Sequence, residues 1–200
     1  MAESRVTRRQ LFAVATEQRG YFTASQAVEL GYSHQAQAHH VNAGNWLRVD
    51  RGIFRLTDWV AGPLDELARW SLWARGRGVI SHESAMAVHG IGEFESDQVH
   101  LTVPPQFTMF DPALSLHVAL LPHTAITDGG GFRVTEPART LIDIAAQSPE
   151  VDQLARAIDD AVSRGLLGRR ALRTLPHQAE AIDPRAALYI ERALAQGTLR

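Results

Sequence analysis

The sequence predicts an α+β protein whose N-terminal domain is mostly helical and whose larger C-terminal domain is mixed α/β, with a small sheet and C-terminal helices. Two closely spaced helical patterns near the start are followed by two short β-forming segments. Further along, alternating strand patterns precede amphipathic helices. The 200 residues are 45% hydrophobic, enough for two small cores. Ala61-Gly62-Pro63 predicts the boundary, which gives domains 1–60 and 61–200.

Charge is distributed unevenly along the chain. Residues 1–60 contain seven Arg and five acidic residues, about +2, whereas the other 140 contain 13 Arg and 17 acidic residues, about −4. Contact with nucleic acid is therefore expected in the first domain. The absence of Lys excludes a Walker-type phosphate loop and a kinase-type strand lysine, and the absence of Cys excludes disulfides and zinc-thiolate sites.

No part of the sequence suggests a membrane or secretory protein. The apolar runs end well before the roughly 20 residues that a membrane helix needs, and the first residues do not resemble a signal peptide. We therefore expect a cytoplasmic protein with no membrane partner.

The first domain begins with three expected helices. Apolar residues between Ser4 and Gln18 fall mostly on one face, and Gly20 is a suitable stop. Thr23 is a suitable N-cap for a second helix that ends at Gly31, and Ser33 can cap a third helix two residues later. Two helices joined by so tight a turn indicate a helix-turn-helix.

A β-hairpin is expected directly after the third helix. The segments Trp46–Val49 and Ile53–Leu56 are β-forming, and Asp50-Arg51-Gly52 provides a glycine-containing turn between them. Such a hairpin after a helix-turn-helix forms a wing, so the sequence predicts a winged helix-turn-helix that binds duplex DNA. A winged helix that mediates only protein contacts is the alternative.

DNA contacts are expected from the third helix, the wing and the first helix. Gln35 and Asn42 are informative because Gln and Asn side chains can bond bidentately to adenine. Arg51 at the wing tip, Arg48 and Arg55 beside it, and the arginines of the first helix can reach phosphates. The residues expected at the interface are Arg8, Arg9, Thr23, Ser33, His34, Gln35, His39, Asn42, Arg48 and Arg51. Gln37 occupies a position that is usually apolar in this motif, so either the helix is rotated or Gln37 has a buried partner.

The sequence predicts no metal site. His34, His39 and His40 have no carboxylate or fourth ligand beside them. His82 and His89 lack the four-residue spacing of a zincin helix and are expected to be core residues with satisfied nitrogens. The three glycines after Asp128 are expected to form a turn rather than a phosphate-binding loop.

The second domain combines strand and helix patterns. Strands are expected at Val99–Val103 and Leu116–Leu121, a hairpin follows near Asp128, and Ser81 is a suitable N-cap for an earlier helix. Further helices are expected after Thr135, which can serve as N-cap, from Val151 to Val162, and after Pro184. Arg139 and Asp143 are spaced i, i+4, as in a surface ion pair.

Taken in order, these segments resemble the AbiEi family of antitoxins from type IV toxin-antitoxin pairs. The matching segments are the helix-turn-helix ending in GNWLRVDRGIFRL, then VISHESAMAVHGIG, the strand pair, and DGGGFRVTEPARTLIDIAA. The resemblance implies autorepression at operator DNA with inverted repeats, with two copies per operator. It also implies that the C-terminal domain counteracts a nucleotidyltransferase-like toxin without a stable complex.

The mode of toxin neutralisation stays open. Thr135, Arg139 and Asp143 are the candidates for the antitoxin function, without a cofactor and without assignable catalytic residues. One alternative is an enzyme that transfers phosphate to the toxin with ATP and Mg²⁺, using Asp143, Asp159, Asp160 and several Arg. Another is a module that masks the active site of the toxin, and a third is a plain transcriptional regulator.

Overall fold

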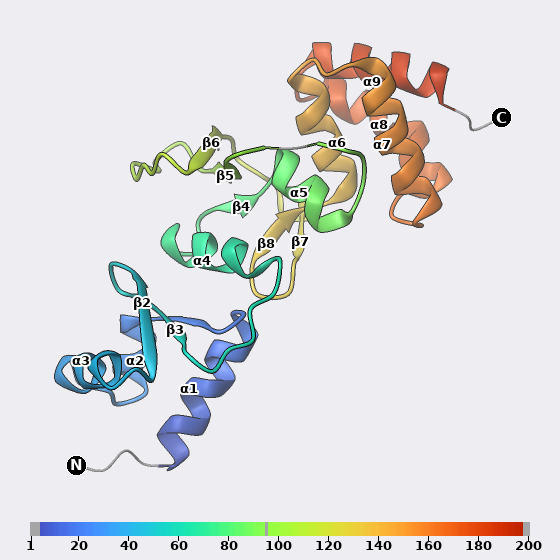
Figure 1. Cartoon of the computed structure of the whole chain (residues 1–200). Coiled ribbons are helices and arrows are strands. Elements are labelled where there is room, and N and C mark those ends of the chain that lie inside the picture. Colours follow the sequence, from blue (N-terminus) through green and yellow to red (C-terminus); the bar gives the residue numbers. More distant parts are fainter. Residues whose placement is uncertain (1–4, 95, 198–200) are drawn as a thin grey trace. The chain divides into compact units, whose positions relative to one another are not determined.

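The computed structural model describes residues 5–94 and 96–197, which form two compact units (Figure 1). The first unit extends to Gly78 and also includes the short segment 128–133, and the second contains 79–127 and the chain from Val134 onward. Helices and strands occur together, which confirms the α+β class. Within the described residues, no helix combines the length and apolar character that crossing a bilayer requires.

The first unit has the element order of a winged helix-turn-helix, followed by one more helix. Its elements are α1 (Arg5–Glu17), β1 (Tyr21–Thr23), α2 (Ala24–Glu29), α3 (His34–Asn42), β2 (Trp46–Asp50), β3 (Ile53–Leu56) and α4 (Asp65–Trp73). Strand β3 lies between β1 and β2 and pairs antiparallel with both. The expected helices and hairpin are confirmed. Strand β1 was not predicted, because three residues are too few to show an alternating pattern.

Aromatic side chains form the core of the first unit. Phe22 of β1 is paired with Phe54 of β3, with ring centroids 5.7 Å apart, and Trp46 meets Phe22 edge-on at 4.8 Å. Leu11 and Ala15 of α1 complete the cluster. Each such aromatic pair adds about 0.5–1.5 kcal/mol to the stability of the fold, beyond the contribution of its buried area. The aromatic core therefore stabilises the sheet on which α2 and α3 are positioned.

Helix α4 belongs to the first unit, beyond the boundary expected at residues 60–61. Asp65 is buried and accepts hydrogen bonds from Trp59 Nε1 at 2.9 Å and from the main-chain N–H of Gly62 at 2.8 Å. Arg69 lies 3.7 Å from Asp50 at the end of β2. Helix α4 also packs against β1 and β3, and the first unit accordingly extends to Gly78.

A five-stranded mixed sheet organises the second unit. Its order is β6-β5-β4-β8-β7, with β4 (Val79–Ile80), β5 (Val99–Val103), β6 (Leu114–Val118), β7 (Ile126–Asp128) and β8 (Arg133–Thr135). Strand β5 pairs antiparallel with β4 and parallel with β6, and β4 pairs parallel with β8. The strand expected at Val99–Val103 is confirmed. The strand expected at Leu116–Leu121 begins and ends earlier, because its pairing with β5 runs from Leu114 to Val118.

Helices form the rest of the second unit. They are α5 (His82–His89), a 3₁₀ turn at His123–Ala125, α6 (Pro137–Ala146), α7 (Val151–Ser163), α8 (Arg169–Glu180) and α9 (Pro184–Gln196). Helices α6 to α9 pack side by side, with α9 against each of the other three (Figure 1, yellow to red). Leu141, Leu154, Ile158, Leu175 and Ile190 lie in their common core. Helix α8 was not predicted, because Pro176 interrupts a polar, arginine-rich pattern.

Two expected N-caps differ in the structure. Thr135 is the last residue of β8, and Glu136 occupies the N-cap position of α6, so the prediction for Thr135 is wrong. Its buried hydroxyl instead lies 2.7 Å from Thr140 Oγ1. Ser81 stands at the N-cap of α5, but its hydroxyl bonds to side chains rather than to the helix backbone.

Candidate nucleic-acid interface

Helix α2 is tied at its first turn to both β1 and the wing. Thr23 Oγ1 accepts from the main-chain N–H of Gln26 at 3.2 Å, and Gln26 Oε1 accepts from the N–H of Thr23 at 2.8 Å. This reciprocal pair is a capping box, which satisfies two main-chain donors at once. The N–H of Ala24 donates to the carbonyl of Gly52 in the wing turn at 2.8 Å. Thr23 is therefore the N-cap expected from the sequence, and its hydroxyl is engaged within the fold.

The turn between α2 and α3 is held by a buried glutamine. Gly31 has a φ of +95°, which favours glycine, and Tyr32 after it is buried. Gln37 of α3 is only 3% exposed, and its Nε2 donates to the carbonyls of Ala24 and Tyr32, each at 3.2 Å. The polar residue at an apolar position thus has buried partners. Its amide fixes the start of α2 and the turn relative to α3.

One face of α3 is exposed and carries most of the side chains expected to read DNA. His34, Gln35, His39 and Asn42 are all exposed, together with Ala38 between them. Ser33 is also exposed, but its Oγ accepts from the N–H of Ala36 at 3.2 Å and so caps the helix, as expected. The opposite side of the helix carries the buried Gln37. Gln35, His39 and Asn42 are spaced i, i+4 and i+7, which places them on one side of the helix, with His34 toward the edge of that side.

His40 has a different role from its neighbours. Its ring stacks on Trp46, with centroids 4.6 Å apart and planes 13° from parallel, and meets Tyr32 edge-on at 5.4 Å. Arg8 of α1 lines a cleft that His40, Asn45 and Trp46 also line. The C-terminal end of α3, the base of the wing and α1 therefore meet at one concave surface of the first unit.

The wing presents arginines at its tip and along β2. Arg51 is exposed in the turn, where Gly52 adopts a φ of +74°, and Arg48 is exposed with its guanidinium 5.2 Å from the centre of the Phe54 ring. Asp50 accepts a hydrogen bond from the N–H of Arg51 at 2.6 Å. Arg55 is half-buried on the central strand, so it is less accessible than the sequence suggested.

The N-terminal half of α1 adds three exposed arginines. Arg8 and Arg9 are exposed as expected, and Arg5 joins them one turn earlier, beside the exposed Phe12. Arg5 was missed, although its i, i+3 and i+4 spacing to the other two was visible in the sequence. These side chains suit contacts with a phosphate backbone, which position a protein without reading sequence.

The residues expected to serve the antitoxin function lie in a buried part of the second unit. Arg139 Nε donates to Asp143 Oδ1 at 2.7 Å, and Asp143 is 5% exposed, so the expected surface ion pair is a buried one. Burial raises the pKa of Asp143 to about 6, against the opposing effect of Arg139. Asp143 Oδ2 is buried and, in the part of the chain that the structure describes, receives no hydrogen bond.

The acidic residues of the enzymatic alternative do not come together. Asp160 Oδ2 accepts from the N–H of Gly92 at 2.9 Å and so has a structural partner. Across residues 5–94 and 96–197, Asp143, Asp159 and Asp160 do not form a group that could hold a metal ion. The group that does qualify is His82, His100 and His117, which no sequence pattern indicated. His82 is buried with Nδ1 2.9 Å from Ser81 Oγ, so one of its two ring nitrogens has the partner expected from the sequence.

Comparison with known proteins agrees with this geometry. Residues 9–57 match a family model described as a transcriptional regulator, the AbiEi antitoxin. Over its whole length the chain is similar in fold to the crystal structure of the RV2827C protein from Mycobacterium tuberculosis, with a TM-score of 0.55 and 12% identity, covering 84% of that chain. The sequence has no match among curated proteins. The matched segment contains the helix-turn-helix and both strands of the wing, so this part of the first unit resembles the AbiEi antitoxin transcriptional regulators.

Proposed function

We propose that the first unit binds operator DNA and represses the protein's own operon, and that the second unit neutralises a nucleotidyltransferase-like toxin. The exposed face of α3 is the observation that carries the first half. It presents Gln35 and Asn42, two side chains suited to adenine, on a helix whose position is fixed by Gln37. Exposed arginines of the wing and of α1 supply cations for phosphates.

In this proposal α3 recognises the bases, and the arginines determine the affinity for the DNA backbone. The formal charge of the whole chain is −2, so nonspecific attraction to DNA is weak, and specific contacts must supply much of the discrimination. Inverted repeats would place two copies on one operator, with half-sites about one helical turn of 10–10.5 base pairs or a multiple of it apart.

Fluorescence anisotropy with the full-length chain tests operator binding. The probe is a duplex from immediately upstream of the protein's own reading frame, and the competitor is a shuffled duplex of the same composition, both at one stated salt concentration. We expect at least a tenfold preference for the upstream duplex and protection of two half-sites in a footprint. Equal affinity for the two duplexes would rule out specific repression.

A growth assay separates repression from neutralisation. The full chain and the adjacent toxin gene are expressed from independent promoters, with either the wild type or the double variant Gln35→Ala/Asn42→Ala. Both side chains are exposed, and each unit has its own core, so the variant should lose operator binding yet still restore growth. Loss of both properties would contradict the assignment of neutralisation to the second unit.

A further inference from the structure

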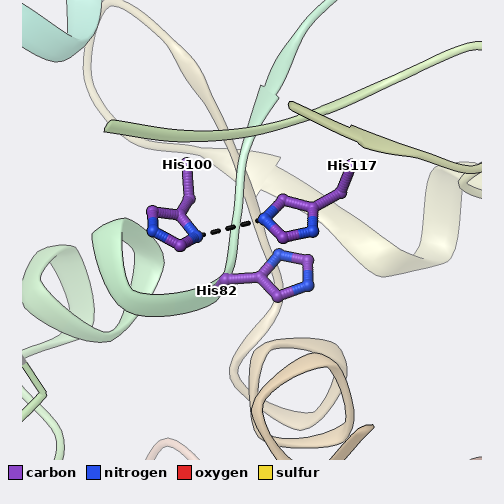
Figure 2. Close-up of side chains that lie close together, drawn as sticks. All are labelled: His82, His100 and His117. Atoms are coloured by element: carbon purple, nitrogen blue, oxygen red, sulfur yellow. Dashed lines mark hydrogen bonds between the residues drawn. The ribbon is translucent and has the colours of Figure 1, made fainter. Parts of the chain in front are cut away.

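Three histidines from separate elements of the second unit meet at one place. His82 is the first residue of α5, His100 lies in β5, and His117 lies in the parallel neighbour β6. Figure 2 shows their rings together: His100 Nδ1 is 3.1 Å from His117 Nε2, and the His82 ring stacks on that of His117 with centroids 3.5 Å apart. One nitrogen of each ring lies within 4.8 Å of the others.

The backbone of the second unit brings these side chains to one face. His117 is paired with Thr102, and His100 lies two residues before Thr102, so both histidines project from the same side of the sheet. The N–H of Ser81 donates to the carbonyl of His100 at 3.1 Å, which holds His82 beside β5. His82 adopts a φ of +52°, a conformation that is uncommon for residues other than glycine and is over-represented at functional sites.

The hydrogen bonds around His100 assign its tautomer. Ser96 Oγ donates its proton to the carbonyl of Gln98 at 3.0 Å, so it accepts from His100 Nε2–H at 2.9 Å. A neutral His100 ring therefore presents a lone pair at Nδ1. That lone pair faces Glu83 Oε2 at 2.8 Å and His117 Nε2 at 3.1 Å.

Three electron-rich atoms so close together need a positive charge between them. A single proton on His100 Nδ1 can be directed at Glu83 Oε2 or at His117 Nε2, but not at both. A metal cation accepts several lone pairs at once. At Zn–N distances of about 2.0–2.1 Å, tetrahedral ligands lie roughly 3.3 Å apart, close to the separation of His100 and His117.

His82 and His117 would supply the other two imidazoles, and the His82 ring would have to turn out of its stack with His117 for both to point at one cation. His82 Nδ1 is 2.9 Å from Ser81 Oγ, and ligation through Nε2 would need Nδ1 to carry the proton and donate it to Ser81, the kind of bond that ligating histidines commonly have on their other nitrogen. Burial, reinforced by His117, lowers the pKa of His82 to about 3, and burial also lowers the pKa of His117.

We propose that His82, His100 and His117 bind one divalent transition-metal cation of the zinc class, with the Glu83 carboxylate as the fourth ligand. Three imidazoles and one carboxylate form a closed tetrahedral set, which is typical of a structural site rather than a catalytic one. The cation would join the start of α5 to strands β5 and β6 and so stabilise the second unit. This proposal does not depend on DNA binding.

Metal analysis of the untagged full-length chain tests the site. After dialysis against chelator and titration with ZnCl₂, we expect one zinc per chain and a higher Tm, and with CoCl₂ the visible absorption of tetrahedral cobalt(II). His117→Gln and Glu83→Gln should each weaken binding at least tenfold. The matched control is His34→Gln/His39→Gln in α3, which removes two exposed histidines of the first unit and should leave zinc affinity unchanged.

The same measurements can overturn the proposal. Wild-type protein that is folded by circular dichroism but binds no zinc at micromolar concentration would show that the three rings form only a packed cluster. Zinc binding that is unaffected by His117→Gln but lost in the α3 control would place the metal elsewhere. If His117→Gln does not fold, Glu83→Gln and the cobalt spectrum of the wild type still decide between these results.

Discussion

Gln37 Nε2 donates a hydrogen bond to the main-chain carbonyl of Tyr32 at 3.2 Å inside the helix-turn-helix core. The same amide also donates to the carbonyl of Ala24. A polar side chain therefore holds the two helices together at a position where an apolar side chain usually packs between them. These two hydrogen bonds explain how the motif keeps its geometry although Gln37 is buried. The two glutamines of α3 therefore have different roles. Gln35 is exposed toward the proposed DNA, whereas Gln37 holds the fold.

Gln37→Ala should destabilise the first unit by about 1–3 kcal/mol, because it leaves buried carbonyls without their donor. Gln35→Ala removes the same side chain from the exposed face of the same helix and should change the free energy of unfolding by no more than about 0.5 kcal/mol. Urea unfolding of both variants checks this. Equal effects would mean that the two hydrogen bonds of Gln37 contribute nothing to stability.

Thr23→Ala should cost about 1 kcal/mol, because it removes the side-chain half of the capping box with Gln26. Thr23→Ser keeps the hydroxyl and should recover most of the loss. Thermal unfolding of the two variants measures the difference. If serine and alanine destabilise equally, the methyl group of Thr23 rather than its hydroxyl matters.

Arg51→Ala should weaken binding to every DNA sequence and reduce the slope of log K against log salt by about 0.9, the value for one phosphate contact. Arg169→Ala is the control, because it removes an exposed arginine at the start of α8 in the second unit. Binding isotherms at several salt concentrations give both slopes. An unchanged slope for Arg51→Ala would show that the wing tip does not contact DNA phosphates.

The Asp143 carboxyl should make stability depend on pH. Burial raises its pKa in the folded protein to about 6, above the ordinary value of 3.8, so the folded state binds the proton more tightly than the unfolded state. This contribution is complete below pH 3.8 and is lost as pH rises through 6. It amounts to at most about 3 kcal/mol for roughly two pH units.

Comparison with Asp143→Asn isolates that effect, since the variant cannot titrate at this position. The stability of the wild type relative to the variant should therefore increase as the pH falls from 7 to 4. Urea unfolding of both proteins at several pH values measures the gap. A gap that stays constant or shrinks would show that the carboxyl is already ionised throughout this range.

Much of the first unit could be predicted because its signals are local. Thr23 and Ser33 cap helices next to them in sequence, and Gly52 marks a turn between adjacent strands. Strand β1 could not be predicted in the same way, since its three residues form a strand only by pairing with β3. The hydrogen-bond partners of Gln37 could not be predicted from local sequence either, because one of them, Ala24, lies 13 residues away.

The second unit was less predictable because its sites combine distant segments. His82, His100 and His117 are 18 and 17 residues apart, and no spacing rule joins them. Only the parallel pairing of β5 with β6 and the contact between Ser81 and His100 bring the rings together. Thr135 was misassigned as a cap for the same reason, since the pairing of β4 with β8 at Val134 extends the strand into Thr135.

The most direct test of the central claim is the sequence preference of α3, measured by anisotropy with the operator duplex and its shuffled counterpart at one salt concentration. Gln35→Ala/Asn42→Ala should lower operator affinity by about 1–3 kcal/mol for each lost base contact while leaving binding to the shuffled duplex nearly unchanged. The result that would contradict the account is a double variant that still prefers the operator as strongly as the wild type does.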